Sequence, residues 1–413
     1  MQFSTSRRSF VIGGLALASA ELFIAPGAAA EIGDFEPWRP GFLDIHHIST
    51  GRGNSTLLIC PDGKSIMIDA GAVKSASEGM DAARPNGSRR PGEWIGRYAL
   101  HHLRTAPRQE LDYFVLTHFH GDHMGDLSPD SPLSRYGNYR LTGVTAVAEL
   151  IPIRCLIDRG FSAYDYPAPA VYDATLNYIQ FVHSLEKRGF IVQRLDVGSS
   201  RQIVSAAPEM LVRNLAANGQ VWIGQGDGKR DLFPPIAKLT PETLPPENTC
   251  SIALRVSYGE FTYYTGGDLT CDTNFGTAMW QDVETAVARV AGPVNVAALD
   301  HHGYFDATGP EFVRLMRPRV VIAQTWHASH PALSVLNTVY SKALYSGDRD
   351  VFATGLVPAA GLADARFSDR MQSQHGHVVV RVASGGAQYE VIVLDDNVEE
   401  GKVKARFGPY RSA

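Results

Sequence analysis

The sequence predicts an α/β fold built around β-sheets. Short apolar runs typical of strands recur in both halves of the 413-residue chain, helical segments separate them, and no fixed-period repeat interrupts the pattern. The composition is that of a globular protein, with 44% hydrophobic and 20% charged residues. A disordered, collagen-like or disulfide-framework chain is therefore excluded, since the four cysteines are few and widely scattered.

Residues 1–30 are expected to form an export signal. The pair Arg7-Arg8 precedes a short apolar run, and Ala28-Ala29-Ala30 offers a cleavage site before Glu31. This pattern resembles a twin-arginine signal, with an ordinary secretory signal as the alternative. The expected product is a single soluble domain, residues 31–413, in the periplasm or secreted, with no further membrane-spanning segment.

Four strands and one helix are predicted before residue 118. The tetrapeptide Pro61–Lys64 is a good hairpin connection between the second and third strands. The predicted strands are 42–50, 56–60, 65–68 and 111–117, and the predicted helix is 92–104.

The interval 130–246 is interpreted as an elaboration of the core fold. It combines proline-rich loops with several short strands and a helix from Tyr172 to Lys187. Regular strand patterns then resume, with one further helix at 281–290. The later predicted strands are 251–257, 261–265, 294–299, 320–323, 378–382 and 389–394.

The segment Thr117–His123 carries the strongest chemical signal. It reads Thr-His-Phe-His-Gly-Asp-His and follows a buried strand directly, so that a tight loop can point three imidazoles and one carboxylate into one hollow. Neutral imidazole and carboxylate are ligands that divalent zinc prefers, and they also suit manganese and iron. His118 and His120 alternate along an extended segment, which places both on one side.

With this loop, three other segments resemble the metallo-β-lactamase superfamily. Ser65–Gly71 (Ser-Ile-Met-Ile-Asp-Ala-Gly) precedes the histidine loop, and Tyr264–Leu269 (Tyr-Thr-Gly-Gly-Asp-Leu) and Leu299–Gly303 (Leu-Asp-His-His-Gly) follow it in the family's order. The resemblance spans residues 42 to about 330. It implies an αββα sandwich with metals at the sheet edge and an insertion between the histidine loop and a bridging aspartate.

The resemblance also implies a ligand set for two divalent ions, expected to be zinc. Asp268 would bridge the two ions, and Asp69 would orient the histidine loop from behind. His301 and His302 are adjacent, so they are expected to point in different directions; His302 is favoured as the ligand, with His301 supporting it. The expected metal ligands are His118, His120, Asp122, His123, Asp268 and His302.

One ligand of the family is missing. Many members place another histidine between the loop and the bridging aspartate, but the interval 124–267 contains only His183, which is expected on a helix face. The corresponding position reads Glu247-Asn248-Thr249. Water or Asn248 would fill the first metal site, or it would stay empty.

Two further histidines are catalytic candidates beside Asp122. His327 and His330 follow the apolar run Val320–Ala323, whose end would lie near the metal rim. They are expected either to contact substrate and donate a proton, or to be solvated loop residues.

The motif combination is most similar to the soluble domain of DNA-uptake competence proteins and to choline-phosphate esterases. It implies hydrolysis of a small-molecule phosphodiester or another ester-type bond by metal-activated water. The alternatives are a β-lactamase or lactonase, a mono-iron redox enzyme, and an exported metal-binding protein without catalysis. The formal charge of −5 argues against a nucleic-acid partner, and a Cys250–Cys271 disulfide stays undecided.

Overall fold

The computed structural model describes residues 33–74, 79–363 and 365–413. The expected export signal at residues 1–30 lies outside the described residues. Among the described helices, none is both long and apolar enough to span a membrane.

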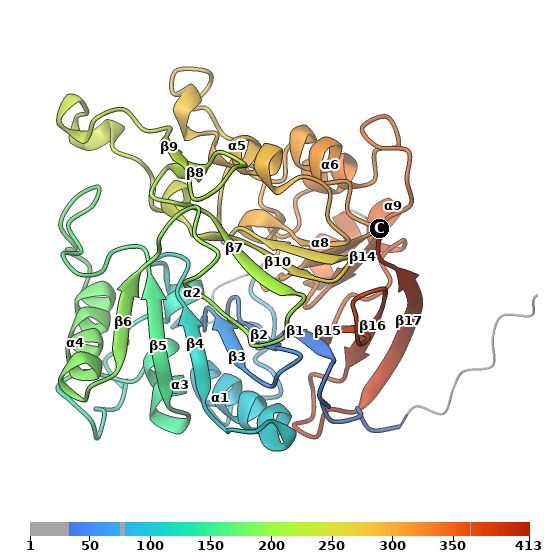
Figure 1. The fold of residues 1–413 in the computed structure, drawn as a ribbon, viewed down its shortest axis with the longest axis horizontal. Helices are drawn as coiled ribbons and strands as arrows, with labels where there is room; N and C mark the ends of the chain where they lie inside the picture. The colour runs from blue at the N-terminus through green and yellow to red at the C-terminus, as the bar shows by residue number, and fades with distance from the viewer. Residues whose placement is uncertain (1–32, 75–78, 364) are drawn as a thin grey trace, which may run out of the picture. The chain divides into compact units, whose positions relative to one another are not determined.

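The first sheet has nine strands in the order β17-β16-β15-β1-β2-β3-β4-β5-β6 (Figure 1). Strands β3 to β6 run parallel to one another, whereas β1 pairs antiparallel with both β2 and β15. The bounds are β1 Leu43–His47, β2 Thr56–Ile59, β3 Ser65–Ile68, β4 Leu111–Val115, β5 Ile153–Asp158, β6 Ile191–Arg194, β15 His377–Val382, β16 Gln388–Leu394 and β17 Val403–Arg411.

The second sheet has eight strands in the order β14-β13-β12-β11-β10-β7-β8-β9. Here β11 to β14 are parallel, and β7 to β10 pair antiparallel. The bounds are β7 Met210–Ala217, β8 Gln220–Trp222, β9 Lys229–Asp231, β10 Ala253–Tyr258, β11 Phe261–Thr265, β12 Val296–Ala298, β13 Val320–Ala323 and β14 Asp350–Ala353.

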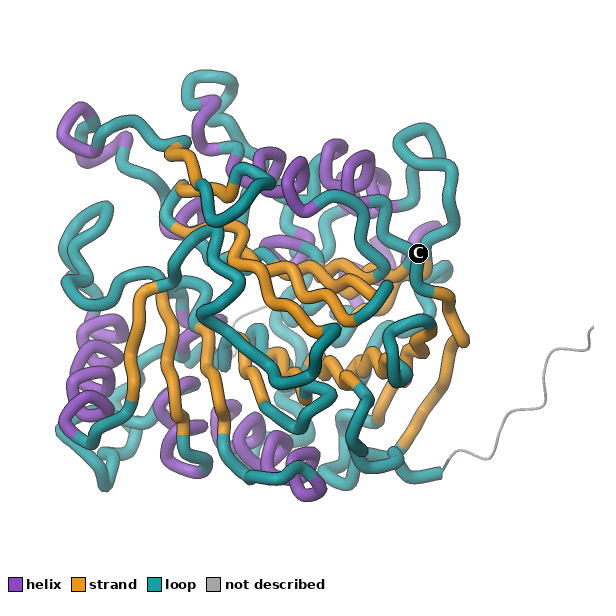
Figure 2. The backbone as a smooth tube through the Cα atoms, in the orientation of Figure 1, coloured by secondary structure: helices purple, strands orange, loops and turns teal. Residues whose placement is uncertain are grey.

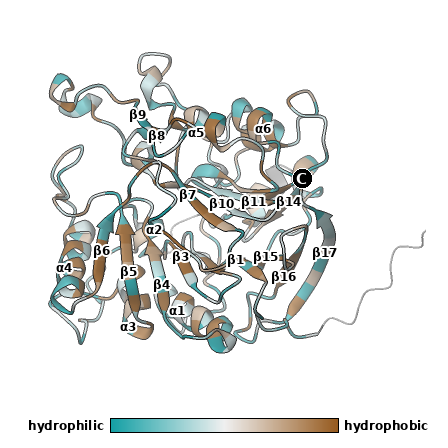
Figure 3. Cartoon of the chain, in the orientation of Figure 1, coloured by the Kyte–Doolittle hydropathy of each residue, from teal (hydrophilic) through white to brown (hydrophobic). Residues whose placement is uncertain are grey.

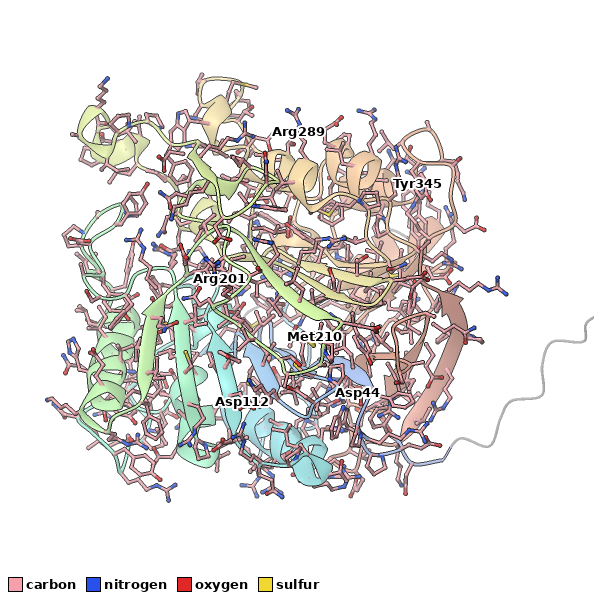
Figure 4. The ribbon with its side chains drawn as sticks, viewed as in Figure 1. Asp44, Asp112, Arg201, Met210, Arg289 and Tyr345 are labelled. Atoms are coloured by element: carbon pink, nitrogen blue, oxygen red, sulfur yellow. The ribbon has the colours of Figure 1, made fainter. Side chains whose placement is uncertain are left out.

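The sheets face each other and helices cover their outer faces, so the residues from 33 onward form an αββα sandwich (Figures 1 and 2). A central core between the sheets includes Ile45, Val256 and Met210, which is labelled in Figure 4. Separate cores lie under the helices of each outer layer. The helices are α1 Pro91–His102, α2 Gly121–Met124, α3 Val144–Leu150, α4 Asp173–Lys187, α5 Val283–Ala291, α6 Pro310–Met316, α7 Leu333–Val339, α8 Pro358–Ala363 and α9 Ala365–Ser368.

Local sequence explains the main elements. Strands β1, β2 and β3 are buried along their whole length because they lie between two layers. The hydropathy of β3 is correspondingly high (Figure 3), whereas β1 also buries Asp44, His46 and His47. Helix α5 begins after Asp282, whose carboxylate accepts the N–H of Thr285, and it ends at Gly292 with a φ of 64°.

The αββα class expected from the sequence is confirmed, and each strand and helix predicted by residue range overlaps an observed element, whereas β14, β17, α6 and α7 were not predicted. The interval 130–246 is more than a set of surface additions, because β5 and β6 extend the first sheet and β7 to β9 extend the second. Cys250 and Cys271 are free thiols in the structure, so they form no disulfide.

A cluster of buried histidines joins β1 to α1 and β15, away from the histidine loop. The Tyr98 ring lies 4.2 Å from the His102 ring and 4.5 Å from the His377 ring, and the Tyr98 hydroxyl is 3.0 Å from His46 Nδ1. The N–H of Ser49 donates to His377 Nδ1 at 3.0 Å, so that nitrogen carries no proton. Nearby, an ion pair joins Arg381 to the buried carboxylate of Asp44 (labelled in Figure 4).

Burial lowers the pKa of His377 to about 4 and the pKa of His47 to about 4. The unfolded chain takes up these protons near the ordinary value of 6.5, whereas the folded chain does not. The folded state therefore loses stability as the pH falls from 6.5 towards 4.

We predict that lowering the pH from 7 to 5 decreases the free energy of unfolding by about 2 kcal/mol for each of these two histidines. Urea unfolding at both pH values would measure the loss. His377→Gln, whose amide oxygen can accept the Ser49 N–H, should shrink the loss by about that amount, whereas the exposed His183→Gln should leave it unchanged. An identical pH dependence in His377→Gln and the parent would refute the assignment.

Candidate metal centre

The predicted ligands meet where parallel strands of both sheets end. The histidine loop follows β4, Asp268 follows β11, and the turn 300–303 follows β12. These are the carboxyl ends of neighbouring parallel strands, the edge at which α/β sheets place their sites. The loops also bond to each other, through Ile252 N to Thr117 O at 3.1 Å and His301 N to Gly267 O at 3.0 Å.

Two glycines let the chain pack directly against the histidine loop. A Cβ on Gly71 would lie 1.9 Å from the carbonyl oxygen of Asp122, and a Cβ on Gly53 would lie 2.3 Å from it. In the native chain that oxygen instead accepts the N–H of Asn54 at 2.8 Å, while Ala70 donates to the carbonyl of His123 at 2.8 Å. The Asp-Ala-Gly sequence is thus a backbone cradle for the loop.

Donor atoms converge in two groups that share one carboxylate. Atoms from each group lie within 4.8 Å of one another, and Asp268 belongs to both. The first group is His118, His120 and Asp268, and the second is Asp122, His123, Asp268 and His302. All six residues expected as ligands are therefore brought together.

Hydrogen bonds behind the histidines aim their other nitrogens into the centre. His123 Nδ1 lies 2.7 Å from Asp69 Oδ2, and His302 Nδ1 lies 3.0 Å from Asn54 Oδ1. Each Nδ1 therefore carries the proton, which leaves the Nε2 lone pair facing Asp268. Asp69 also accepts the N–H and the hydroxyl of Thr117, both at 2.8 Å.

The innermost atoms have the arrangement expected of donors around a cation. His123 Nε2 and Asp268 Oδ1 are 3.0 Å apart and buried, yet neither makes a hydrogen bond. His118 Nε2 likewise faces His120 Nδ1 at 3.2 Å. Buried polar atoms without partners are rare, and lone pairs that face one another fit a shared metal ion.

The electrostatics agree with this reading. Burial favours a neutral acid at Asp268, but the charges of His123 and His302 outweigh it and hold the pKa of Asp268 well below its usual range. Burial likewise opposes an imidazolium at His123, but the surrounding carboxylates raise the pKa of His123 well above its usual value. The carboxylates around His123 therefore stabilise a positive charge between the donor atoms, and a divalent ion would supply that charge.

His301 and His302 both face Asp268, contrary to the expectation that adjacent histidines point apart. Their Nε2 atoms lie 3.8 Å and 3.6 Å from Asp268 Oδ2. Left-handed backbone at both residues, with φ of 45° and 57°, turns the two rings to the same side. Such consecutive left-handed residues store strain, which is typical of functional sites.

Of the two, only His302 belongs to a donor group. Its Nε2 lies 2.9 Å from Asp122 Oδ2. His301 is held instead by Asp306, at 2.7 Å from Nδ1, and by the Asn248 amide nitrogen, at 3.2 Å from Nε2.

The position of the missing histidine is occupied by Glu247 and Asn248. Glu247 accepts the N–H of Phe119 at 2.8 Å and forms an ion pair with Arg159, so it fixes the histidine loop rather than binding metal. Asn248 Oδ1 is buried and makes no hydrogen bond with the described residues. His183 lies exposed on α4, as expected for a helix-face residue.

The candidate catalytic histidines lie beside the second donor group. His330 is buried and stacks on His302 at 4.8 Å, and burial lowers its pKa well below the usual value. His327 is half-buried and its Nδ1 lies 2.8 Å from the Ser329 hydroxyl. Both line a cavity of about 310 Å³ that also contains Asp122.

Sequence reasoning missed several supporting residues. Asn54, Asp306, Arg159 and Gln324 carry no local signal in the sequence that marks them as part of the site. Gln324 places its carbonyl oxygen 3.2 Å from His302 Nδ1. Only the fold brings these residues to the ligands.

One known protein family matches part of the chain. Residues 49–129 match the metallo-beta-lactamase superfamily. This segment contains Asp69 and the whole histidine loop, whereas Asp268 and His302 lie beyond it and depend on the geometry above. No curated protein matches the chain.

Two solved structures are similar over most of the described fold. A mutant of the CmlA beta-hydroxylase covers 84% of this chain with 12% identity and a TM-score of 0.39, and this chain spans 55% of its length. Unliganded yeast PDE1 covers 83% of this chain with 11% identity and a TM-score of 0.36, and this chain spans 99% of it.

We predict that Gly71→Ala lowers metal affinity about 10- to 100-fold, because the new methyl group must displace the Asp122 carbonyl. Competition with a chelator, beside thermal unfolding, would measure the change. Gly87→Ala is the matched control, since its Cβ would meet nothing within 4 Å. Equal affinities in the two variants would contradict the cradle.

The two adjacent histidines should differ in their effect on metal content. His302→Ala removes a donor of the second group and should lose about one equivalent of metal per chain after dialysis. His301→Ala should keep the parent's stoichiometry. Elemental analysis would decide, and the reverse result would show that His301 is the ligand.

Proposed function

We propose that the chain is a metal-dependent hydrolase of the metallo-β-lactamase superfamily with a two-metal centre, acting on phosphodiester or other ester-type bonds. The observation that carries this proposal is the pair of donor groups that share Asp268. Two divalent ions in such a centre supply an activated water and stabilise developing charge on the substrate.

An open centre supports catalysis over a purely structural role. Structural zinc sites are normally closed by four protein ligands. The group of His118, His120 and Asp268 has three, and His120 is exposed. The ligands therefore leave room for water and substrate.

The chain's own residues have separable roles in this proposal. Asp122 ligates from the second group and faces the smaller cavity, where it can orient a water molecule. His327 and His330 line the same cavity and are placed to contact the substrate or move a proton. Asp69, His301 and Asn248 hold the neighbouring groups in position.

The preference for phosphodiesters rests on motif likeness to the competence-protein and choline-phosphate esterase branch. The polar Glu247-Asn248-Thr249 segment, in place of a middle histidine, supports that branch over β-lactamases and lactonases. The Arg7-Arg8 pair supports export to the periplasm or beyond the cell. A mono-iron redox enzyme and a non-catalytic metal-binding protein are alternatives that the experiment below separates.

We predict about two divalent ions per chain and turnover of bis(4-nitrophenyl) phosphate. His120→Ala and Asp268→Ala should each lower turnover by at least about 100-fold, because each removes a donor from the shared centre. Elemental analysis and release of nitrophenolate would measure the two quantities on the same preparations. The exposed His183→Ala provides the matched control and should behave as the parent.

One tightly held ion, with no turnover of phosphodiester, carboxylic ester, lactone or β-lactam, would refute the hydrolase proposal. Bound iron with oxygen uptake would favour the redox alternative.

A further inference from the structure

Two cavities of very different size border the metal centre. A cavity of about 1030 Å³ reaches His120 of the first donor group, and a cavity of about 310 Å³ reaches Asp122 and His302 of the second. A substrate whose scissile bond lies at the shared centre therefore has space on both sides, and the two spaces are unequal.

The larger cavity has a mainly apolar and aromatic wall. Phe119 of the histidine loop packs at 5.9 Å from the ring of Tyr164, and prolines and Tyr166 continue the lining. Pockets of this composition bind apolar and aromatic groups by burying their surface. Val171 and Tyr172 extend the apolar lining outward, with exposed fractions of 71% and 77%.

Three polar groups of this wall, those of Tyr164, Arg159 and Glu247, are already paired. The Tyr164 hydroxyl donates to the buried Asp158 at 2.7 Å, which also accepts the Tyr178 hydroxyl at 2.8 Å. The charge of Arg159 is balanced by Glu247, and its guanidinium lies 4.5 Å from the centre of the Phe119 ring. Lys74, Asp126, Arg140 and Asp173 also line the cavity, so its wall offers ring faces beside charged side chains.

The smaller cavity is different in character. Imidazoles of His301, His302, His327 and His330 surround it together with Trp326. Its volume is less than a third of the larger one, so of two unequal groups the smaller fits beside Asp122.

From this asymmetry we propose that the substrate is an ester with one bulky apolar or aromatic group and one small group. The bulky group occupies the larger cavity against Phe119 and Tyr166, and the small group occupies the cavity lined by His327 and His330. This inference rests on the proposed hydrolase function and specifies its substrate class.

Two matched phosphodiesters test the proposal, 1-naphthyl 4-nitrophenyl phosphate and methyl 4-nitrophenyl phosphate. The methyl ester combines one aromatic and one small group, whereas the naphthyl ester has two aromatic groups. The parent should therefore show a kcat/KM for the methyl ester at least about 10-fold above that for the naphthyl ester, because only the methyl ester has groups that match the two cavities. Ala168→Trp and Ala170→Trp fill the larger cavity, which would hold the 4-nitrophenyl group, and should lower kcat/KM for the methyl ester at least about 10-fold.

Ala163→Trp is the matched control, since this exposed residue of the same loop lies outside the cavity lining and should keep the parent's kcat/KM for both esters. Binding of 1-naphthyl phosphate, measured by calorimetry, adds a readout independent of turnover. The parent and Ala163→Trp should bind it, and the two filling variants should bind at least about 10-fold more weakly.

The outcomes separate the inference from the function on which it rests. Turnover of both esters at equal efficiency, unchanged by the filling variants, overturns the substrate class and leaves the hydrolase intact. No turnover, with naphthyl phosphate binding lost only in the filling variants, supports the cavity assignment and refutes phosphodiester hydrolysis. Equal binding in all four proteins overturns the cavity assignment.

Discussion

One buried carboxylate organises the centre of this protein. Asp268 is 1% exposed and has four imidazoles within 3.8 Å of its oxygens, those of His118, His123, His301 and His302. An isolated carboxylate buried this deeply would be expensive, so the surrounding loops must supply compensating positive charge. The cradle of glycines, the left-handed histidine turn and the hydrogen bonds behind each ring all serve that convergence.

The αββα architecture makes the convergence achievable. Parallel strands of the two sheets end at a common edge, and each ligand-bearing loop leaves one of those ends. A buried pair of acids supports the histidine turn from below: Tyr264 donates to Asp300 at 3.0 Å, and Glu284 accepts the N–H groups of Thr308 and Gly309. Burial raises the pKa of Asp300 well above its usual range, which disfavours a further negative charge beneath the ligands.

Strands β14 and β17 were not predicted, and Asp268 and His302 were expected as donors only through the family resemblance. Local patterns did predict most of the other strands, the main helices and the histidine loop, because each depends on residues close together in the chain. The Ser65–Gly71 strand and the Thr117–His123 loop are examples. Interactions across the fold were not predictable in the same way. Asn54 and His302 are 248 residues apart, and the orientation of His301 depends on left-handed backbone that its neighbouring residues do not encode. The interval 130–246 was predicted to be an elaboration, and its strands were not recognised as extensions of the two sheets, because short strands in proline-rich sequence resemble loops.

The contact between Asp122 and His302 joins residues 180 positions apart, from loops that belong to different sheets. Closing such a long loop has an entropic cost, which is offset only when both sheets have formed and packed together. The donor groups therefore assemble late in folding. An ion that binds these groups therefore selects the fully folded chain and stabilises it by mass action. In this way occupancy of one small site ties the stability of the two sheets together.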